Sequence, residues 1–223
     1  MAEMYLVRHG QASFGGDDYN CLSPLGVRQS IRLGKYFAAQ SFSFERVVTG
    51  SLRRQRQTAD GILAGMQADI AREEDPALNE YDSKSLRRAA IEQYPALKAE
   101  LEGDMRAYYR GLKRVLHLWS EDAIGGPVAE RWGDFQARVA CARRRIQRSG
   151  WRRVLVISSG GVIATIAQQV LCAPPQSAID LNLQIYNSSL SRYFFNVNTF
   201  ALGSFNYIPH LRPVEDAELI TYG

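Results

Sequence analysis

The sequence predicts an α/β fold of three layers: a mostly parallel sheet flanked by helices on both faces, with a helical insertion and a β-rich C-terminal edge. Two short apolar runs, residues 4–7 and 153–158, are typical of buried strands, and each ends in a glycine-containing turn. Amphipathic segments alternate with further strand candidates between these runs. This alternation favours a parallel sheet that helices cover on both faces.

The first strand, residues 4–7, leads into a polar, glycine-containing loop over residues 13–20. Ser23 is a good N-cap and Pro24 suits the first helical position, so we expect a helix to begin there. Residues 44–49 form the next strand candidate. A second helix is expected over residues 52–66, with basic side chains in its first turns, where helix N-termini favour anions.

The middle of the chain predicts helices that lie outside the main alternation. Ile70 marks a short strand candidate. Helical segments are expected over residues 85–101 and 105–119, and both are strongly polar and interrupted, by Pro95 and Gly103. We interpret residues 1–223 as a single domain that carries a helical insertion at about residues 84–130.

The last third returns to the alternating pattern. A helix is expected over residues 131–148, the clearest buried strand over 153–158, and a helix over 162–171 that Pro174 and Pro175 end. Residues 190–197 and 200–207 are β-rich and predict a hairpin. The acidic tail from Pro213 is expected at the surface.

Composition and charge are ordinary for a globular protein, at 46% hydrophobic and 22% charged residues. The net charge is +4 and the pI about 9.0. We interpret the densest basic cluster as a solvated helix end; it lacks the interleaved aromatic residues of a nucleic-acid surface, so no nucleic-acid partner is expected. The cluster comprises Arg143, Arg144, Arg145, Arg148, Arg152 and Arg153.

Cysteine usage and hydropathy indicate the compartment. The three cysteines, Cys21, Cys141 and Cys172, are far apart and fit a reducing environment better than a disulfide framework or a zinc site. The N-terminus does not resemble a signal peptide, and no apolar run approaches the roughly 18 residues of a membrane span. We therefore expect a cytoplasmic protein with no membrane partner.

Loops that follow the predicted strands carry the chemistry. Arg8, His9 and Gly10 end the first strand, and Arg53 and Arg54 begin the helix after the second. The carboxyl ends of parallel strands share one edge of a sheet, so these loops converge there with the turn at Ser159. With Glu80 from a turn-rich loop, the set suits a phosphoryl group: arginines bind its oxygens, an imidazole attacks and a carboxylic acid protonates the leaving oxygen.

At this point the sequence resembles the histidine phosphatase superfamily, the phosphoglycerate-mutase-like enzymes. The matches run in that family's order from residue 4 to about residue 197. They are Leu6-Val7-Arg8-His9-Gly10-Gln11, then Leu22-Ser23-Pro24-Leu25-Gly26 with Gln29, Ser51 to Ala59, Leu78-Asn79-Glu80, Val154 to Gly161, and Asn187-Ser188-Ser189.

The resemblance implies roles for particular residues. His9 attacks phosphorus and carries it as a phosphohistidine, while Glu80 protonates the leaving group and later activates water. Arg8 and Arg54 bind the phosphoryl oxygens. Further phosphate-binding positions are implied at Gln11, Ser159 and Gly160. Neither a metal nor a cofactor is implied, because the arginines provide the positive charge.

One position departs from the family pattern. Ser159 stands where the family has a second catalytic histidine, and it brings one neutral hydrogen-bond donor in place of a charge. Losing one preorganised donor typically costs about 10²–10³ in rate. His210, which follows the last strand, is a candidate accessory residue that folds back over the site. His117, in the helical insertion, is expected to be a surface or packing residue.

Rival assignments stay open at two of the catalytic positions. Arg53 and Arg56 compete with Arg54, and Asp82 is the alternative acid to Glu80. Ser159 is not expected to act as a nucleophile, since its turn is not a Gly-x-Ser-x-Gly elbow.

Two functions compete on this sequence, with a third behind them. The first is a metal-independent phosphatase acting through His9 on a phosphorylated small molecule or phosphoprotein. The second is a catalytically weakened or inactive relative that binds a phosphorylated ligand or a protein partner. A phosphoglycerate mutase is the third. The insertion is expected to recognise the substrate. An acidic substrate is favoured by four arginines of the insertion, Arg87, Arg88, Arg106 and Arg110. The identity of the substrate and the oligomeric state, for which a dimer is one option, stay open.

Overall fold

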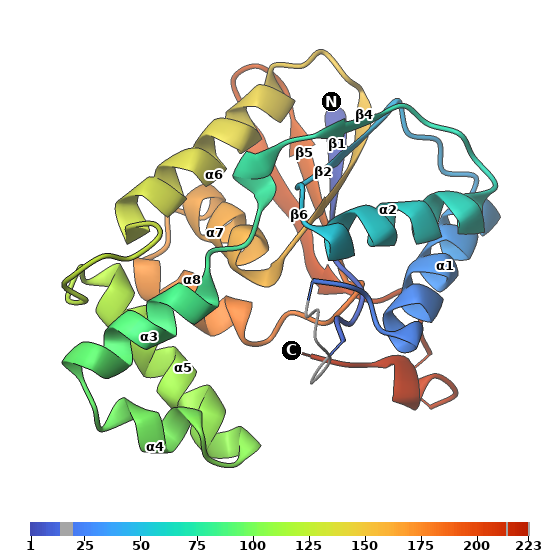
Figure 1. The fold of residues 1–223 in the computed structure, drawn as a ribbon. Helices are drawn as coiled ribbons and strands as arrows, with labels where there is room; N and C mark the ends of the chain where they lie inside the picture. Colours follow the sequence, from blue (N-terminus) through green and yellow to red (C-terminus); the bar gives the residue numbers. More distant parts are fainter. Residues whose placement is uncertain (14–19, 213, 223) are drawn as a thin grey trace.

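The computed structural model describes residues 1–13, 20–212 and 214–222, so most of the expected loop at 13–20 lies outside the described residues. Its sheet has six strands in the order β3-β2-β4-β1-β5-β6 (Figure 1). Strands β1 to β4 run parallel to one another. Strand β5 runs antiparallel to β1 and to β6, which confirms the predicted hairpin of β5 and β6. The bounds are β1 Ala2–Arg8, β2 Arg46–Thr49, β3 Arg72–Glu74, β4 Arg153–Ser158, β5 Leu190–Phe195 and β6 Phe200–Tyr207.

Helices cover both faces of this sheet, which confirms the three predicted layers. Tyr5 and Val7 of β1 pack in one core, under α1 (Pro24–Ala39) and α2 (Arg53–Met66). Met4 and Leu6 point to the opposite core, because successive side chains of a strand alternate between its faces. Helices α6 (Trp132–Gln147) and α7 (Gly160–Val170) cover that second face.

The helical insertion forms a lobe beside the sheet (Figure 1). It comprises α3 (Ser83–Gln93), α4 (Leu97–Leu101) and α5 (Met105–Ser120). The expected helix over 85–101 is thus two helices, separated around Pro95. Leu86, Leu116 and Trp119 anchor the lobe in the same core as α6 and α7. Two short 3₁₀ turns, η1 (Pro76–Leu78) and η2 (Ala217–Leu219), complete the described elements.

Three local features differ from what the sequence predicted. Ile70 lies outside the third strand, β3, which pairs with β2 through the exposed residues Arg72 and Glu74. An edge strand with one neighbour needs no apolar signal, so its sequence gave none. Helix α7 ends before the two prolines, as expected, but Pro175 also begins a further helix, α8 (Pro175–Asn182), which was not predicted from the sequence; proline favours the first helical turn. The tail is partly buried, since Leu219 is packed in and its carbonyl accepts a hydrogen bond from Gln29 Nε2 at 2.8 Å.

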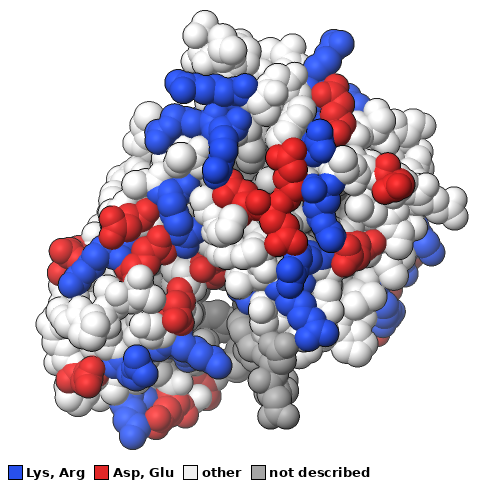
Figure 2. Space-filling view, turned by 45° about the horizontal axis from the view of Figure 1, so that its top comes forward, with Lys and Arg blue, Asp and Glu red and all other residues white. Residues whose placement is uncertain are grey.

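Charged side chains of both signs are interspersed over the face in Figure 2. Several arginines of the basic cluster are anchored to the fold, so the cluster is less of a free solvated face than expected. Arg145 pairs with Asp75, Arg153 pairs with Glu3, and the Arg143 guanidinium lies 5.1 Å from the centre of the Phe200 ring. Within the described ranges, none of the helices has the length and apolar character needed to cross a membrane.

Candidate active site

Strand β1 holds Arg8 and His9 at the centre of the sheet. The His9 amide donates to Ser158 O of the parallel neighbour β4 at 2.9 Å, and the Arg8 amide donates to Ser189 O beside β5 at 3.0 Å. The carboxyl end of β1 is therefore fixed from both sides. This is the sheet edge at which the sequence placed the chemistry.

The turn after His9 packs tightly against the start of α1. A Cβ atom on Gly10 would lie 2.4 Å from Gly26 O, so only glycine fits there. The sequence suggested that Gly10 allows a ligand to approach; the structure shows that it allows helix α1 to approach. Gln11 belongs to the same contact, because its Oε1 accepts from Ser23 Oγ at 2.8 Å, and it does not line the cavity.

Hydrogen bonds define the tautomer of His9. Nδ1 lies 2.7 Å from Gly10 O, which can only accept, so Nδ1 carries the proton. Arg54 Nε donates to His9 Nε2 at 3.1 Å, so Nε2 holds the lone pair. Burial, reinforced by the charges of Arg54 and Arg8, lowers the pKa of His9 well below 6.5. The imidazole is therefore neutral and suited to nucleophilic attack through Nε2.

Two buried arginines flank this imidazole. Arg54 is 7% exposed, and Thr58 ties it to the catalytic turn: Thr58 Oγ1 donates to Arg54 O at 2.7 Å and accepts from the Gly10 amide at 3.0 Å. Its rival Arg53 is exposed, and Arg56 pairs with Glu74 outside the cavity. Arg8 is also 7% exposed, and its Nη1 donates to Ile185 O.

Glu80 reaches the same cavity from the loop before α3. Its Oε2 accepts from the Gly161 amide at 3.0 Å, and its Oε1 accepts from the Tyr81 amide at 3.2 Å. A Cβ atom on Gly161 would lie 2.4 Å from Glu80 Oε1, which explains a glycine at that position. Burial raises the pKa of Glu80 against the opposing effect of these amides and of Arg54 and Arg8. Asp82, the alternative acid, caps α3 by accepting from the Lys84 and Ser85 amides.

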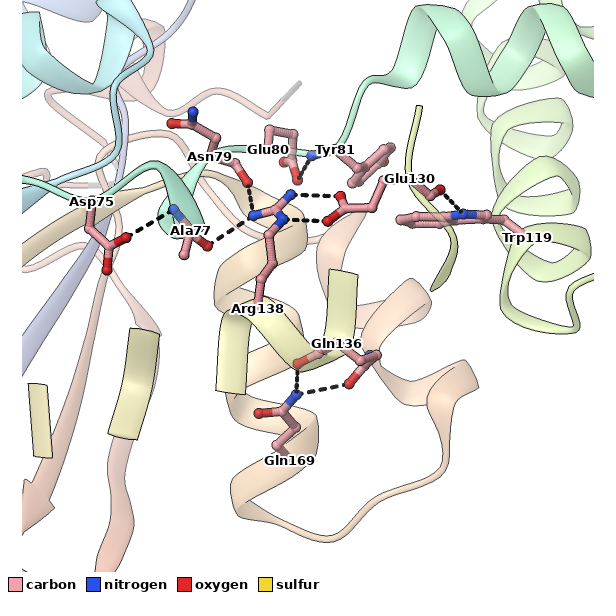
Figure 3. A network of polar contacts seen from close by, with 10 residues as sticks. All are labelled: Asp75, Ala77, Asn79, Glu80, Tyr81, Trp119, Glu130, Gln136, Arg138 and Gln169. Carbon is pink, nitrogen blue, oxygen red and sulfur yellow. Dashed lines mark hydrogen bonds and ion pairs between the residues drawn. The ribbon is translucent and has the colours of Figure 1, made fainter. Parts of the chain in front are cut away.

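An arginine holds the loop that carries Glu80 (Figure 3). Arg138 Nη1 donates to Ala77 O at 2.9 Å and to Asn79 O at 2.8 Å. Glu130 binds the same guanidinium as a bidentate partner: Nε donates to Oε1 at 2.5 Å and Nη2 donates to Oε2 at 2.9 Å. Between these carbonyls, Leu78 O accepts from Ser158 Oγ at 2.7 Å and from Gln55 Nε2 at 3.1 Å. Hydrogen bonds therefore hold the three backbone carbonyls that precede Glu80.

Ser159 is engaged by a side chain of α2 and does not line the cavity. Its Oγ is buried and accepts from Gln55 Nε2 at 2.9 Å. Gly160 faces Asn182, whose Oδ1 would lie 2.4 Å from an added Cβ. Neither residue is among the described residues that line the cavity. Of the five predicted phosphate-binding residues, the structure therefore brings Arg8 and Arg54 together and leaves Gln11, Ser159 and Gly160 outside.

His210 lies behind the catalytic turn, outside the described cavity lining. Its Nε2 is 2.9 Å from Ser188 Oγ, and the Ser188 amide donates to His9 O at 3.3 Å. Burial lowers the pKa of His210 to about 3. His210 thus supports the turn and does not fold over the site. His117 is partly buried in α5, as a packing residue would be.

The cavity has a volume of about 770 Å³ and opens between the sheet edge and the helical lobe. Described residues from β1, α2, α3, α5 and α8 contribute to its walls. Groups of three or more potential metal-ligating side chains do not occur in the described ranges. The lining residues are Arg8, His9, Asn20, Leu52, Arg54, Glu80, Tyr81, Asp82, Ser83, Lys84, Arg87, Gly103, Met105, Tyr108, Tyr109, Leu112, Asn182 and Leu183.

Sequence reasoning missed the residues that support the site. Gln55 and Thr58 are three positions apart at the start of α2 and therefore share a face of the helix. Thr58 accepts from the Gly10 amide, and Gln55 donates to Leu78 O and Ser159 Oγ. That spacing was the available signal. Arg138 lies in the middle of α6 with nothing local to mark it. Asn182 was missed along with α8, for which Pro175 followed by the apolar pair Ala178 and Ile179 was the signal.

Known proteins share this fold. A curated relative, the broad-specificity phosphatase YOR283W of Saccharomyces cerevisiae, is 26% identical over 171 residues, which cover 74% of this chain and 68% of that protein. The crystal structure of phosphoglycerate mutase from Bacillus anthracis superposes with a TM-score of 0.66 at 16% identity, covering 94% of each chain. Phosphoserine phosphatase from Entamoeba histolytica, in complex with 3-phosphoglyceric acid, gives a TM-score of 0.67 at 18% identity, covering 95% of this chain and 100% of the other.

The family model of the histidine phosphatase superfamily, branch 1, matches residues 4–208. This range extends from β1, with Arg8 and His9, through Arg54 and Glu80 to the end of β6. It therefore includes every element that lines the cavity. The chain belongs to branch 1 of the histidine phosphatase superfamily.

Proposed function

We propose that the protein is a phosphatase that hydrolyses phosphomonoesters through a phosphohistidine at His9. The observation that carries the proposal is the state of His9: a neutral imidazole whose Nε2 lone pair is directed at Arg54, in a cavity that also holds Glu80. Membership of the superfamily and the phosphatase named among its relatives support the same reaction.

In the first half-reaction, His9 Nε2 attacks phosphorus and a nitrogen–phosphorus bond forms. The bond between phosphorus and the ester oxygen breaks, and the leaving oxygen takes the proton of Glu80. Arg54 now contacts Nε2 directly, so the incoming phosphoryl group displaces this contact and Arg54 moves to its oxygens. The raised pKa of Glu80 favours the protonated form that this step requires.

In the second half-reaction, ionised Glu80 accepts a proton from water, and the water oxygen attacks phosphorus. The nitrogen–phosphorus bond breaks, inorganic phosphate leaves and His9 returns to its neutral form. Arg8 and Arg54 neutralise the phosphoryl oxygens in both steps, and both are buried, where a fixed charge acts more strongly than in water. This supports a reaction that needs no metal.

One observation favours a second candidate, a module that binds a phosphorylated ligand without turnover. Ser159 Oγ is engaged by Gln55 and does not line the described cavity, so no donor there replaces the second histidine of the family pattern. Arg8 and Arg54 would still bind a phosphate. The mutase has no comparable observation in its favour, since its structural likeness at 16% identity concerns the fold alone.

Phosphate release from a panel of phosphomonoesters, measured with a chelator present, tests the proposal. We expect the wild type to show turnover and an acid-labile phosphoryl label. Both should be lost in His9→Ala. His117→Ala is the matched control, because this histidine lies in α5 outside the cavity lining. Turnover that survives in His9→Ala contradicts the mechanism, whereas phosphate binding without turnover in the wild type favours the binding module.

A further inference from the structure

We propose that this phosphatase acts on phosphomonoesters with an apolar or aromatic body and a second anionic group, which Lys84 and Arg87 bind. The inference rests on the function proposed above and adds the class of substrate. It is carried by the part of the cavity that lies beyond His9, Arg8 and Arg54, where the lining comes from the helical lobe.

The cavity is too large for a phosphate alone. Its volume of about 770 Å³ lies within the range of sites that enclose whole organic molecules, roughly 300–1,000 Å³. The three phosphoryl-binding residues come from β1 and α2, whereas most of the other lining residues come from α3, α5 and their flanking loops. The non-phosphate part of the substrate therefore lies against the lobe.

Apolar and aromatic side chains form much of this lobe wall. Tyr108 and Tyr109 pack edge to face with ring centres 5.8 Å apart, and Leu112 lies one turn further along α5. Tyr81 and Leu183 add to the wall from the loop before α3 and the end of α8. Tyrosine rings offer a large contact area at a low cost in side-chain entropy. Such a wall favours a flat hydrocarbon or aromatic body over a small hydrophilic one.

Two cations interrupt the apolar wall. Lys84 and Arg87 are three positions apart on α3, and therefore neighbours on its surface. Arg87 is positioned, since its Nε donates to Ser83 O at 3.2 Å and its guanidinium carbon lies 5.7 Å from the centre of the Tyr108 ring. This places a cation directly beside the aromatic surface.

Neither cation has an ion-pair partner in the part of the chain that the structure describes. The nearest carboxylate in sequence, Asp82, is engaged in capping α3. Three other cations of the lobe do have partners: Lys98 with Glu102, Lys113 with Asp180 and Arg114 with Glu100. What distinguishes Lys84 and Arg87 from the remaining lobe arginines is that they line the cavity. Two uncompensated cations in a cavity attract anions. The sequence proposed an acidic substrate from four arginines, and the structure places one of them, Arg87, in the lining.

The test uses phenyl phosphates whose para substituents are insulated from the ring, so that the leaving phenols are alike. The set is 4-ethylphenyl, 4-(carboxymethyl)phenyl, 4-(phosphonomethyl)phenyl and 4-(2-aminoethyl)phenyl phosphate. We expect kcat/KM to be about tenfold higher for the two anionic esters than for the ethyl ester, and lower for the amine, since one charged hydrogen bond is worth about that factor. The carboxylate and phosphonate arms show which second anion is preferred.

Variants assign the preference to residues. Lys84→Gln and Arg87→Gln should each lower the ratio of kcat/KM between the carboxymethyl and ethyl esters, and the double variant should bring it to about one. Arg106→Gln is the matched control, because Arg106 is exposed on the same lobe outside the cavity lining. A ratio near one in the wild type, or one that the double variant leaves unchanged, overturns the inference.

Failure of the proposed function gives a different result. If none of the four esters is hydrolysed, or if His9→Ala hydrolyses them equally well, the phosphatase mechanism is wrong. Calorimetric binding of the matching benzylphosphonates, which cannot be hydrolysed, then tests the inference independently. Tighter binding of the carboxymethyl analogue, lost in the double variant, supports it, and equal binding of the ethyl and carboxymethyl analogues overturns it.

Discussion

The inner end of the cavity and its outer wall are held in place by different forces. At the inner end, His9, Arg8 and Arg54 are only 4%, 7% and 7% exposed, and backbone bonds to β4 and β5 fix the strand that carries two of them. The outer wall consists of side chains on helices, and Met105 at its rim is 63% exposed. The lobe that carries this wall is anchored in the core through Leu86, Leu116 and Trp119, and the exposed ion pair of Lys113 with Asp180 adds a contact to α8 at the surface.

This difference separates chemistry from recognition. A change at the inner end leaves a buried polar group without its partner, which costs about 1–3 kcal/mol or more. Exposed pairs on the wall are worth only about 0–1 kcal/mol each. Substitutions on α3 and α5 can therefore alter the substrate while the phosphoryl site stays intact. The predictions below test this contrast.

The largest effect is expected at Glu80. Glu80→Gln removes the proton donor, so kcat for an alkyl phosphate should fall about 10²–10⁴-fold. The loss should be much smaller for 4-nitrophenyl phosphate, whose leaving group needs no proton. Steady-state kinetics on both esters measures this, and an equal loss on both would contradict the role of Glu80 as the acid.

The pH profile of the wild type checks the same pair of groups. Burial raises the pKa of Glu80 above 4.5, so kcat/KM for an alkyl ester should decline only as pH rises through that higher value. The pKa of His9 lies below 6.5, so its neutral form persists into acid and the acidic limb falls well below pH 6.5. An acidic limb centred at or above pH 6.5 would contradict the buried, neutral imidazole.

A large effect on stability is expected behind the inner end, at His210. Its folded pKa of about 3 lies below the ordinary 6.5, so the unfolded chain takes up the proton first. Stability should thus be unaffected above pH 6.5 and fall as pH decreases from 6.5 towards 3, by up to about 4 kcal/mol, with His9 adding in the same sense. Burial is the main cause of this low pKa; the charge of Arg32 lowers it further, and that of Asp216 raises it.

Urea unfolding at pH 7, 5.5 and 4.5 measures this dependence. We expect His210→Gln to flatten it and the control His117→Gln to leave it unchanged. A variant at position 210 with the full wild-type dependence on pH would show that His210 is not the buried group responsible.

A moderate effect is expected at the clamp on the Glu80 loop. Arg138→Gln removes the donors to Ala77 O and Asn79 O, so we expect kcat for an alkyl ester to fall about tenfold, with KM little changed. Because Arg138 acts through Glu80, the basic limb of the pH profile should shift, and Arg138→Lys should restore part of the rate. A loss of stability with an unchanged pH profile would reduce Arg138 to a structural role.

The smallest effect is expected on the surface of the lobe that carries the outer wall. Lys113→Gln removes an ion pair whose side chains are 46% and 48% exposed, so stability should change by less than about 1 kcal/mol. Urea unfolding at low and high salt measures this, and the difference from the wild type should shrink as salt rises. A loss of more than about 3 kcal/mol, as expected for a buried polar group left without its partner, would remove the contrast between the two regions.

The parallel sheet and the residues at its carboxyl edge could be predicted from the sequence because local patterns indicate both. An apolar run followed by Arg8, His9 and Gly10, and a helix that starts at Arg54, can be interpreted without knowing what packs against them. The antiparallel hairpin at the C-terminus was equally visible, in its two β-rich runs.

Long-range contacts could not be predicted in this way. Gly10 faces Gly26, and Arg138 reaches carbonyls some 60 positions earlier in the chain, at separations of 61 and 59 residues. Ser159 looked like a phosphate ligand from its place in the motif, but its hydroxyl is engaged by Gln55, 104 residues away. Burial of the tail at Leu219 likewise depends on Gln29 in α1.

The position of β1 also sets the order in which the site can assemble on the ribosome. The strand that leads to His9 is made before its neighbours β4 and β5, which begin at Arg153 and Leu190. At about 5–20 residues per second, roughly 10–40 s of synthesis separate His9 from its second neighbour. A nascent chain arrested before Leu190 should therefore be inactive and sensitive to protease at β1, so catalytic competence requires that β5 has been made and can pair with β1.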